Sequence, residues 1–173
     1  MRKRVGGVDM KKIAGAAVVI FALLLGLAGC EKAEADPLAV FRGGFSADVV
    51  GELNGTAFSA VVKADAVTET GVLPLTVTFY APSGLSGTVL SRDTEGRVCL
   101  SAGDLTLQSL KNADFSAFFS LFPTVGEVTE VELDQSGLTR VIFGGGSLLL
   151  LPDGTPHTVE CAAGWLRVLS WES

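Results

Sequence analysis

The chain has 173 residues, 48% of them hydrophobic and 18% charged, so it is too apolar to be disordered and long enough for one domain with a targeting segment. It carries 13 basic and 19 acidic residues. An acidic chain without clustered Lys and Arg is not expected to bind nucleic acid, because neutralisation of the phosphates needs such clusters. The single histidine excludes motifs that need two, such as the helical pair of a zinc protease.

An uncharged apolar run covers residues 13–29 and follows Lys11 and Lys12. A basic N-terminal region, a short apolar run and small residues before the cleavage site are typical of a secretory signal peptide. The run ends in Leu27-Ala28-Gly29-Cys30, which resembles the lipobox of bacterial lipoproteins. The resemblance implies that Cys30 receives a diacylglycerol and becomes the new N-terminus after cleavage. The alternative is an uncleaved membrane helix, for which this run is at the lower limit of length.

Cleavage before Cys30 would divide the chain into three parts. Residues 1–29 are the signal peptide, and its first nine residues are interpreted as an over-long start, since Met10 precedes the basic pair. Its removal takes away five basic residues and one acidic residue, which leaves 8 basic against 18 acidic residues, a net charge of −10. Residues 30–40 are then the lipidated cysteine and a tether, and residues 41–173 are one domain. Because anionic headgroups repel such a surface, we expect the lipid to hold the exported protein on the extracytoplasmic side of the bacterial membrane.

The remaining sequence alternates apolar and polar residues with period two, which is typical of β-strands. Residues 45–53 show this alternation, and Asn54-Gly55 predicts a hairpin turn to a return strand at 57–66. Further strands are predicted at 75–80, 85–92, 98–100, 105–107, 127–134, 138–143, 147–151, 157–161 and 165–171. Short strands separated by turn residues at this spacing predict an antiparallel meander.

The segment 113–122 interrupts this pattern. It contains four phenylalanines at i, i+3, i+4 and i+7, namely Phe115, Phe118, Phe119 and Phe122. This spacing predicts a helix with one aromatic face, with Asp114 as its N-cap and Pro123 just beyond its end. In one interpretation the helix fills the open side of the sheet as core. In the other it is a movable cover, and the four rings form the candidate face for an apolar ligand.

Two cysteines remain once Cys30 is assigned to lipid. In an exported protein Cys99 and Cys161 are candidates for a disulfide, and the alternative is two free thiols that each behave as a small hydrophobe on a strand. No residues have the spacing of a nucleophile with its base, a phosphate loop or a metal site. We therefore expect no catalytic residue, no metal, no cofactor and no enzyme activity.

The order of elements from Phe41 to Trp171 resembles the bacterial lipoprotein-localisation-factor fold, a group that includes the periplasmic lipoprotein carrier. The points of likeness are the hairpin 45–66, the segments Phe79-Tyr80-Ala81-Pro82, Leu85-Ser86-Gly87 and Gly103-Asp104-Leu105, and the closing run 151–157 before two strands. The resemblance implies a mainly β (α+β) fold: a curved antiparallel sheet or half-open β-barrel with one or more covering amphipathic helices. It also implies that the concave face takes up acyl chains.

Two functions are compatible with these expectations. The first is a membrane-anchored, non-catalytic binding module for an apolar ligand such as a lipid or an acyl chain. The second is a structural or protein-interaction lipoprotein with a filled core and an envelope protein as partner. A pocket lined by apolar side chains would favour the first, and a solid core with an exposed edge strand would favour the second.

Overall fold

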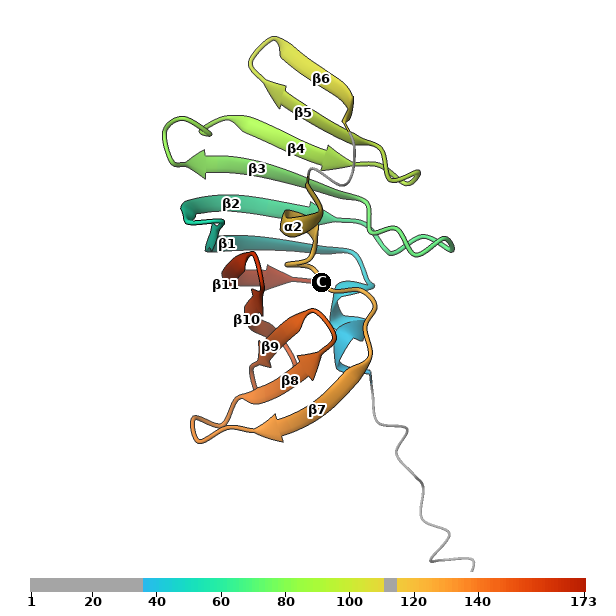
Figure 1. Cartoon of the computed structure of the whole chain (residues 1–173), viewed down its shortest axis with the longest axis vertical. Helices are drawn as coiled ribbons and strands as arrows, with labels where there is room; N and C mark the ends of the chain where they lie inside the picture. The colour runs from blue at the N-terminus through green and yellow to red at the C-terminus, as the bar shows by residue number, and fades with distance from the viewer. Residues whose placement is uncertain (1–35, 111–114) are drawn as a thin grey trace, which may run out of the picture. The chain divides into compact units, whose positions relative to one another are not determined.

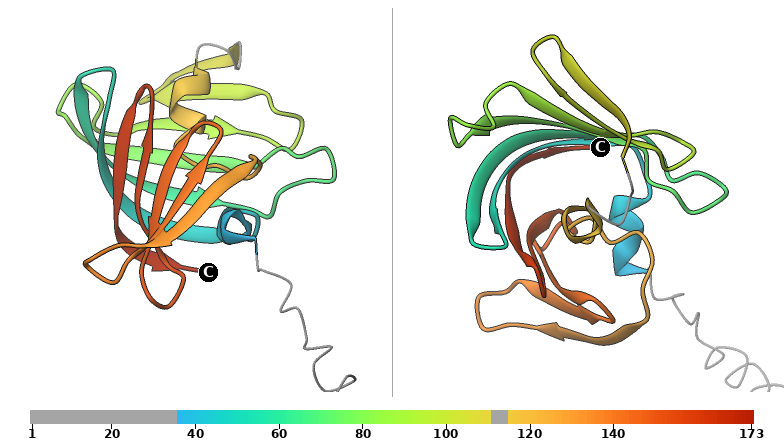
Figure 2. Two further views of the ribbon diagram at one scale, coloured as in Figure 1. Left: turned by 60° about the horizontal axis from the view of Figure 1, so that its bottom comes forward. Right: turned by 45° about the horizontal axis from the view of Figure 1, so that its top comes forward.

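The computed structural model describes residues 36–110 and 115–173, and in these two ranges eleven antiparallel strands form one open sheet (Figure 1). The strands are β1 (Phe45–Leu53), β2 (Thr56–Ala64), β3 (Leu75–Ala81), β4 (Thr88–Arg92), β5 (Val98–Ala102), β6 (Leu105–Leu110), β7 (Val128–Leu133), β8 (Thr139–Phe143), β9 (Gly146–Leu150), β10 (Pro156–Cys161) and β11 (Gly164–Glu172). Their order in the sheet is β6-β5-β4-β3-β2-β1-β11-β10-β9-β8-β7, so that the first and last strands of the domain pair at its centre. The sheet curves strongly around the short helix α2 and leaves β6 and β7 as free edges (Figure 2). This arrangement confirms the predicted half-open antiparallel β-barrel.

The hairpin of β1 and β2 forms where the sequence predicts it. Asn54 and Gly55 have positive φ angles of 49° and 80°, the backbone that a two-residue turn between twisted strands requires. The register pairs Leu53 with Thr56 and Phe45 with Ala64, without an irregularity. Both strands therefore direct alternate residues to the same concave face of the sheet.

The concave face holds the hydrophobic core, because the inward residues of the long central strands are apolar. On β1 and β2 these residues are Phe45, Ala47, Val49, Phe58, Ala60, Val62 and Ala64, all buried. A 3-10 helix, η1 (Pro37–Phe41), adds the fully buried Leu38 and Phe41 to this core. Residues 37–40, the last part of the expected tether 30–40, belong to this helix, which packs against the core, and residues 30–35 lie outside the described residues.

The predicted amphipathic helix is much shorter than expected. Among the described residues 115–122, the α-helix is limited to α2 (Ser116–Phe119). The next two backbone bonds, from Leu121 to Phe118 and from Phe122 to Phe119, are tight i→i+3 turns. The residues 111–114, with the expected N-cap Asp114, lie outside the described residues. The phenylalanine spacing suits a helix, but packing on a curved sheet requires the rings to reach different partners. Phe118 contacts Phe58, whereas Phe122 contacts Phe45.

Strand β4 also begins later than predicted, at Thr88 instead of residue 85. The three residues before it belong to a turn after Pro82. In that turn Leu85 donates a backbone hydrogen bond to Pro82, and Gly87 donates one to Phe79. These bonds use the backbone groups that a longer strand would need for its ladder.

The structure does not contain the predicted disulfide, because Cys99 and Cys161 are both free thiols. Cys99 lies on β5 opposite Ser91, on the convex face. Cys161 lies on β10 and packs against the core on the concave face, where it accepts a hydrogen bond from Ser120 at 3.3 Å. Five strands separate β5 from β10 in the sheet, and a disulfide needs Cα atoms within about 7 Å and converging side chains. This prediction is therefore corrected.

Candidate functional site

The concave face carries two pockets, one toward each end of the strands, with α2 between them. One pocket includes Leu53 and Thr56, which pair beside the turn of the first hairpin. The other includes Arg92, whose partner in the ladder is Leu75 near the opposite ends of β3 and β4. The two pockets are named here after Phe58 and Arg92.

The Phe58 pocket has a volume of about 260 Å³ and lies between α2 and strands β1–β5. Its lining is apolar apart from two threonine hydroxyls, and consists of Leu53, Thr56, Phe58, Phe79, Leu85, Thr88, Leu90, Leu100, Phe115 and Phe118. The ring of Phe118 closes one wall, with its centroid 5.8 Å from those of Phe58 and Phe79. A Cβ on Gly51 would meet the carbonyl oxygen of Trp165 and would lie 2.9 Å from the Phe58 ring, so glycine at this position makes room for both. Apolar concavities with few polar groups are typical of sites for apolar ligands.

The apolar surface of this pocket continues to the free edge of the sheet. Leu100 of the pocket wall pairs with Leu107 of β6, and Ala102 pairs with Leu105. Directly paired residues face the same side of a sheet, so both leucines of β6 lie on the concave side. They are 63% (Leu105) and 46% (Leu107) exposed, which leaves an uncovered apolar margin beside the pocket.

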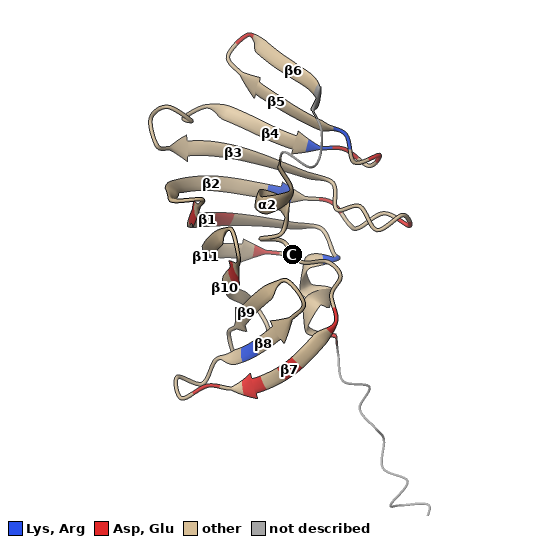
Figure 3. Ribbon diagram, viewed as in Figure 1, with Lys and Arg blue, Asp and Glu red and all other residues tan. Residues whose placement is uncertain are grey.

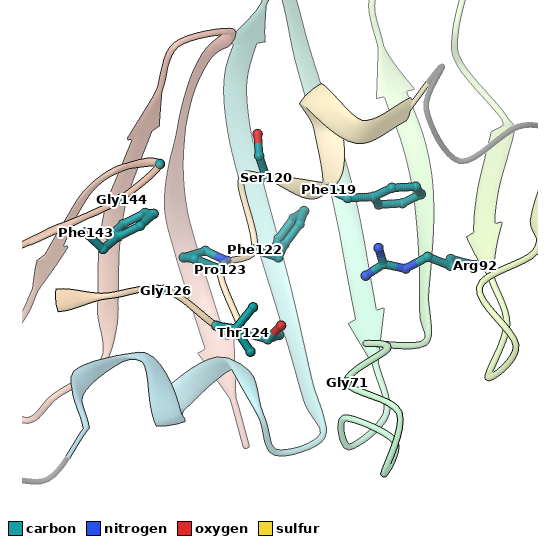
Figure 4. A pocket seen from close by; sticks show the side chains of 12 residues that line it. Gly71, Arg92, Phe119, Ser120, Phe122, Pro123, Thr124, Gly126, Phe143 and Gly144 are labelled. Carbon is teal, nitrogen blue, oxygen red and sulfur yellow. The ribbon is translucent and has the colours of Figure 1, made fainter.

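The Arg92 pocket has a volume of about 430 Å³ and lies on the other side of α2 (Figure 4). Aromatic rings and glycines form most of its wall: Gly71, Phe119, Ser120, Phe122, Pro123, Thr124, Val125, Gly126, Phe143, Gly144 and Gly145, together with Arg92. Arg92 is the basic residue that ends β4 (Figure 3).

Arg92 is a cation on the concave face of the sheet. Its ladder partners Leu75 and Val98 are both buried, which places its side chain on the same side as theirs. The guanidinium carbon lies 4.1 Å from the centroid of the Phe119 ring, and Nε donates a hydrogen bond of 2.9 Å to the carbonyl of Leu73. Burial lowers the pKa of Arg92 from its ordinary value, yet an arginine stays protonated at neutral pH. The site therefore holds a fixed positive charge beside aromatic rings.

Three of the four predicted aromatic residues are core and not free surface. Phe118, Phe119 and Phe122 are buried, and the Phe118 ring contacts those of Phe119 and Phe122 at centroid distances of 6.2 and 5.7 Å. Phe115 is half-buried and lines the Phe58 pocket. The structure thus brings these rings together as the wall between the two pockets. Cys30 and the lipobox residues Leu27, Ala28 and Gly29 lie outside the described residues.

Sequence reasoning did not find Arg92. The signal was present, because Arg92 has the same strand phase as Leu90, which a period-two pattern assigns to the core. A charged residue in a core phase is unusual without a partner or a ligand. Motif spacing detects clusters of reactive side chains, and a lone cation on an apolar face forms no such cluster.

Residues 36–110 and 115–173 contain no group of three His, Cys, Asp or Glu side chains that could hold a metal ion. His157, the single histidine, is half-buried on β10, and its Nδ1 lies 2.9 Å from the hydroxyl of Thr158. Within the same described part of the chain, no helix has the length and apolar character needed to cross a bilayer.

Comparison with known proteins gives a fold likeness. No family model and no curated protein matches the sequence. An uncharacterized conserved protein from Thermus thermophilus is similar in structure, with TM-score 0.51 and 15% identity over 78% of this chain and 80% of that one. MucB has TM-score 0.46 and 17% identity over 80% of this chain and 57% of its own, and it is also solved as the Pseudomonas aeruginosa MucA/MucB complex. A LolA superfamily protein from Nitrosomonas europaea has TM-score 0.38 and 8% identity, over 76% and 86% of the two chains. At such identities the Thermus likeness shows a shared fold and nothing about function.

Proposed function

We propose that this protein is an exported, lipid-anchored binding module that holds an apolar ligand, such as an acyl chain, on the concave face of its sheet. The observation that carries the proposal is the lining of the Phe58 pocket, in which apolar side chains from five strands and the α2 segment converge on about 260 Å³ of space. Burial of apolar ligand surface contributes about 25 cal/mol per Å², so such a wall supplies binding energy without any charged contact.

The uncovered margin of β6 supports an entry route to this pocket. A chain that enters beside Leu105 and Leu107 would meet apolar side chains from solvent to the Phe118 ring. The buried α2 rings support a site that holds its ligand beside the helix, and they do not require the helix to move away as a unit. In this proposal α2 is a fixed wall of the site.

The test is photolabelling of the full chain in nanodiscs with an acyl probe that carries a diazirine in its alkyl tail. We expect labelled peptides from β5 and from the α2 segment. Leu100→Trp places a larger ring in the pocket and should reduce labelling by about tenfold or more. The matched control is Ser101→Trp, since Ser101 is the next residue of β5 and pairs with Val89 on the opposite face. Equal labelling of both variants, or none in the wild type, would contradict the proposal.

A second candidate function, an interaction lipoprotein, is favoured by the two free edges. On β7, Val131 and Leu133 pair with the inward Val141 and with Thr139, and they are 54% and 73% exposed. Unpaired edge strands with exposed apolar residues are common sites of strand addition by another chain. Absence of acyl labelling in the wild type would leave this function as the alternative.

A further inference from the structure

Arg92 has no acidic partner among the described residues, although the chain has more acidic than basic residues. No carboxylate in residues 36–110 or 115–173 forms an ion pair with it, whereas its neighbour Asp93 is bound to Arg97. Within the same described residues, the carbonyl of Leu73 is the hydrogen-bond acceptor of its guanidinium, through Nε. The outer nitrogens of the guanidinium are thus left as donors, and Figure 4 shows them directed toward the interior of the pocket.

The geometry of this guanidinium is fixed before any ligand arrives. The Phe119 ring lies against the guanidinium, with its centroid 4.1 Å from the guanidinium carbon, and the bond from Nε to the Leu73 carbonyl holds the group at a second point. A planar fork of N–H groups matches the two oxygens of a carboxylate or a phosphate. Because the group is already partly buried, an oxyanion placed opposite it would recover interactions that the cation lost on leaving water.

Most of the wall around the fork consists of aromatic rings, glycines and other apolar residues, with Ser120 and Thr124 as its polar side chains. Phe122 and Phe143 line the same pocket, and the volume of about 430 Å³ lies within the usual range for small-molecule sites. The aromatic wall continues to the Phe58 pocket, since the Phe118 ring centroid is 5.7 Å from that of Phe122. A ligand that satisfies both features has a charged head and an apolar body.

We propose that the Arg92 pocket binds the oxyanion head group of an amphiphile, a carboxylate or a phosphate, while the apolar part of that amphiphile lies on the neighbouring phenylalanine wall. This assignment rests on the proposed function, because it names the head group of the same class of apolar ligand.

The test measures photolabelling of the full chain in nanodiscs in the presence of three competitors that each have ten carbons: decanoate, decyl phosphate and decanol. We expect Arg92→Gln to weaken competition by the two anions by about tenfold relative to wild type, and to leave decanol within about twofold. A loss for decanoate alone would assign a fatty-acid carboxylate, and a loss for decyl phosphate alone would assign a phosphorylated lipid head. The matched control is Arg167→Gln, since Arg167 is exposed on the convex face of β11.

Two further measurements keep the test decisive if Arg92→Gln folds poorly. Arg92→Lys keeps the charge and loses the fork, so it should retain part of the preference for anions. In the wild type, a decanoate probe with its diazirine next to the carboxylate should label the peptide 119–126, and the corresponding alcohol probe should not prefer it. Equal competition by anions and decanol in every variant, with acyl labelling intact, would overturn this inference and leave the proposed function standing. Absence of labelling by every probe would overturn both.

Discussion

At the scale of single residues, four loops of the sheet share one backbone pattern. In each, the first residue donates its N–H to the carbonyl four positions on, and its own carbonyl accepts from a glycine three positions on. The first residues are Thr68, Asp93, Asp134 and Leu151, and the glycines are Gly71, Gly96, Gly137 and Gly154, with φ from 80° to 86°. A tight turn that ends in a left-handed glycine is a common three-residue hairpin connection. The glycine at the fourth position is therefore required by the turn itself.

Aspartate at the first position strengthens two of these loops. Asp93 Oδ1 accepts backbone hydrogen bonds of 2.9 Å from Glu95 and Arg97, and its Oδ2 accepts one of 2.7 Å from Arg97 Nε. Asp134 accepts the corresponding backbone bonds from Ser136 and Leu138. The hydrogen bond from Arg97 holds the pKa of Asp93 below its usual value, and that from the Ser136 hydroxyl does the same for the pKa of Asp134.

This lowered pKa predicts a pH dependence for the β4–β5 loop. A carboxylate whose pKa is lower in the folded state stabilises the fold above its unfolded pKa of about 3.9, and this contribution is lost as the pH falls through the folded pKa. Asp93→Asn should therefore lower the melting temperature at pH 7, and the difference from wild type should shrink as the pH falls below about 3.9. Asp104→Asn, in the exposed β5–β6 turn, is the control. A difference that is constant from pH 7 to pH 2.5 would contradict the assignment.

At the scale of elements, α2 shows how a one-turn helix becomes part of a core. It has four residues, too few for stability on its own, because isolated short helices are marginal in water. Its rings lie in an aromatic cluster in which Phe118 contacts Phe58, Phe79, Phe119 and Phe122. The helix is thus held by the concave face, and it in turn separates the two pockets.

This packing predicts unequal roles for the phenylalanines of the α2 segment. Phe118→Ala should lower the free energy of unfolding by about 3–5 kcal/mol, because Phe118 is 4% exposed and its removal leaves a cavity among rings. Phe115→Ala should cost clearly less, since Phe115 is half-buried at the pocket wall. Denaturant unfolding of the two variants measures both values. A cost of about 1 kcal/mol or less for Phe118→Ala would instead support a movable cover.

At the scale of the whole molecule, both edges of the sheet are open and its longest strands lie at the centre. Strands β1, β2 and β11 each have nine residues, and the edge strands have six. Long central strands with alternate buried residues produce the curvature and the concave core, while the edge strands carry exposed leucines and valines on the same face. The sheet domain therefore has a packed core at its centre and uncovered apolar side chains at its two edges, where a ligand or a partner chain can approach.

The proposed attachment to a membrane is tested on the full chain expressed in a bacterium. Mass spectrometry of the wild type should find an N-terminal peptide that begins at Cys30 and carries a diacylglycerol. Cys30→Ala should accumulate at the precursor mass, because no thiol is available for the lipid. Cys99→Ala, which changes a convex thiol on β5, should be lipidated like the wild type. An unmodified N-terminal peptide in the wild type would contradict the lipobox interpretation.

Most of the fold is predictable from local sequence. Alternation along residues 45–53 and the Asn54-Gly55 pair specify the first hairpin, since period two and positive φ are properties of the chain itself. The glycines of the repeated loops and the segments of β7 to β11 follow from the same rules. Two predicted boundaries failed. The helix at 113–122 is shortened to α2, where contacts with distant strands outweigh local preference. Strand β4 begins later than predicted because the turn after Pro82 uses the backbone groups that a longer strand would need.

By itself, the sequence determined the antiparallel meander, its turns and the aromatic segment between β6 and β7, because these depend on neighbours along the chain. Only the tertiary structure decided the pairing of β11 with β1 and the exposure of Leu105 and Leu107. It also placed Cys99 and Cys161 on opposite faces of the sheet. It also decided that Arg92 lies over Phe119 inside the curve of the sheet. The physical reason is that the alternation of side chains along a strand depends on neighbouring residues. Which residues of other strands those side chains meet depends on the curvature of the sheet and on the pairing of distant strands.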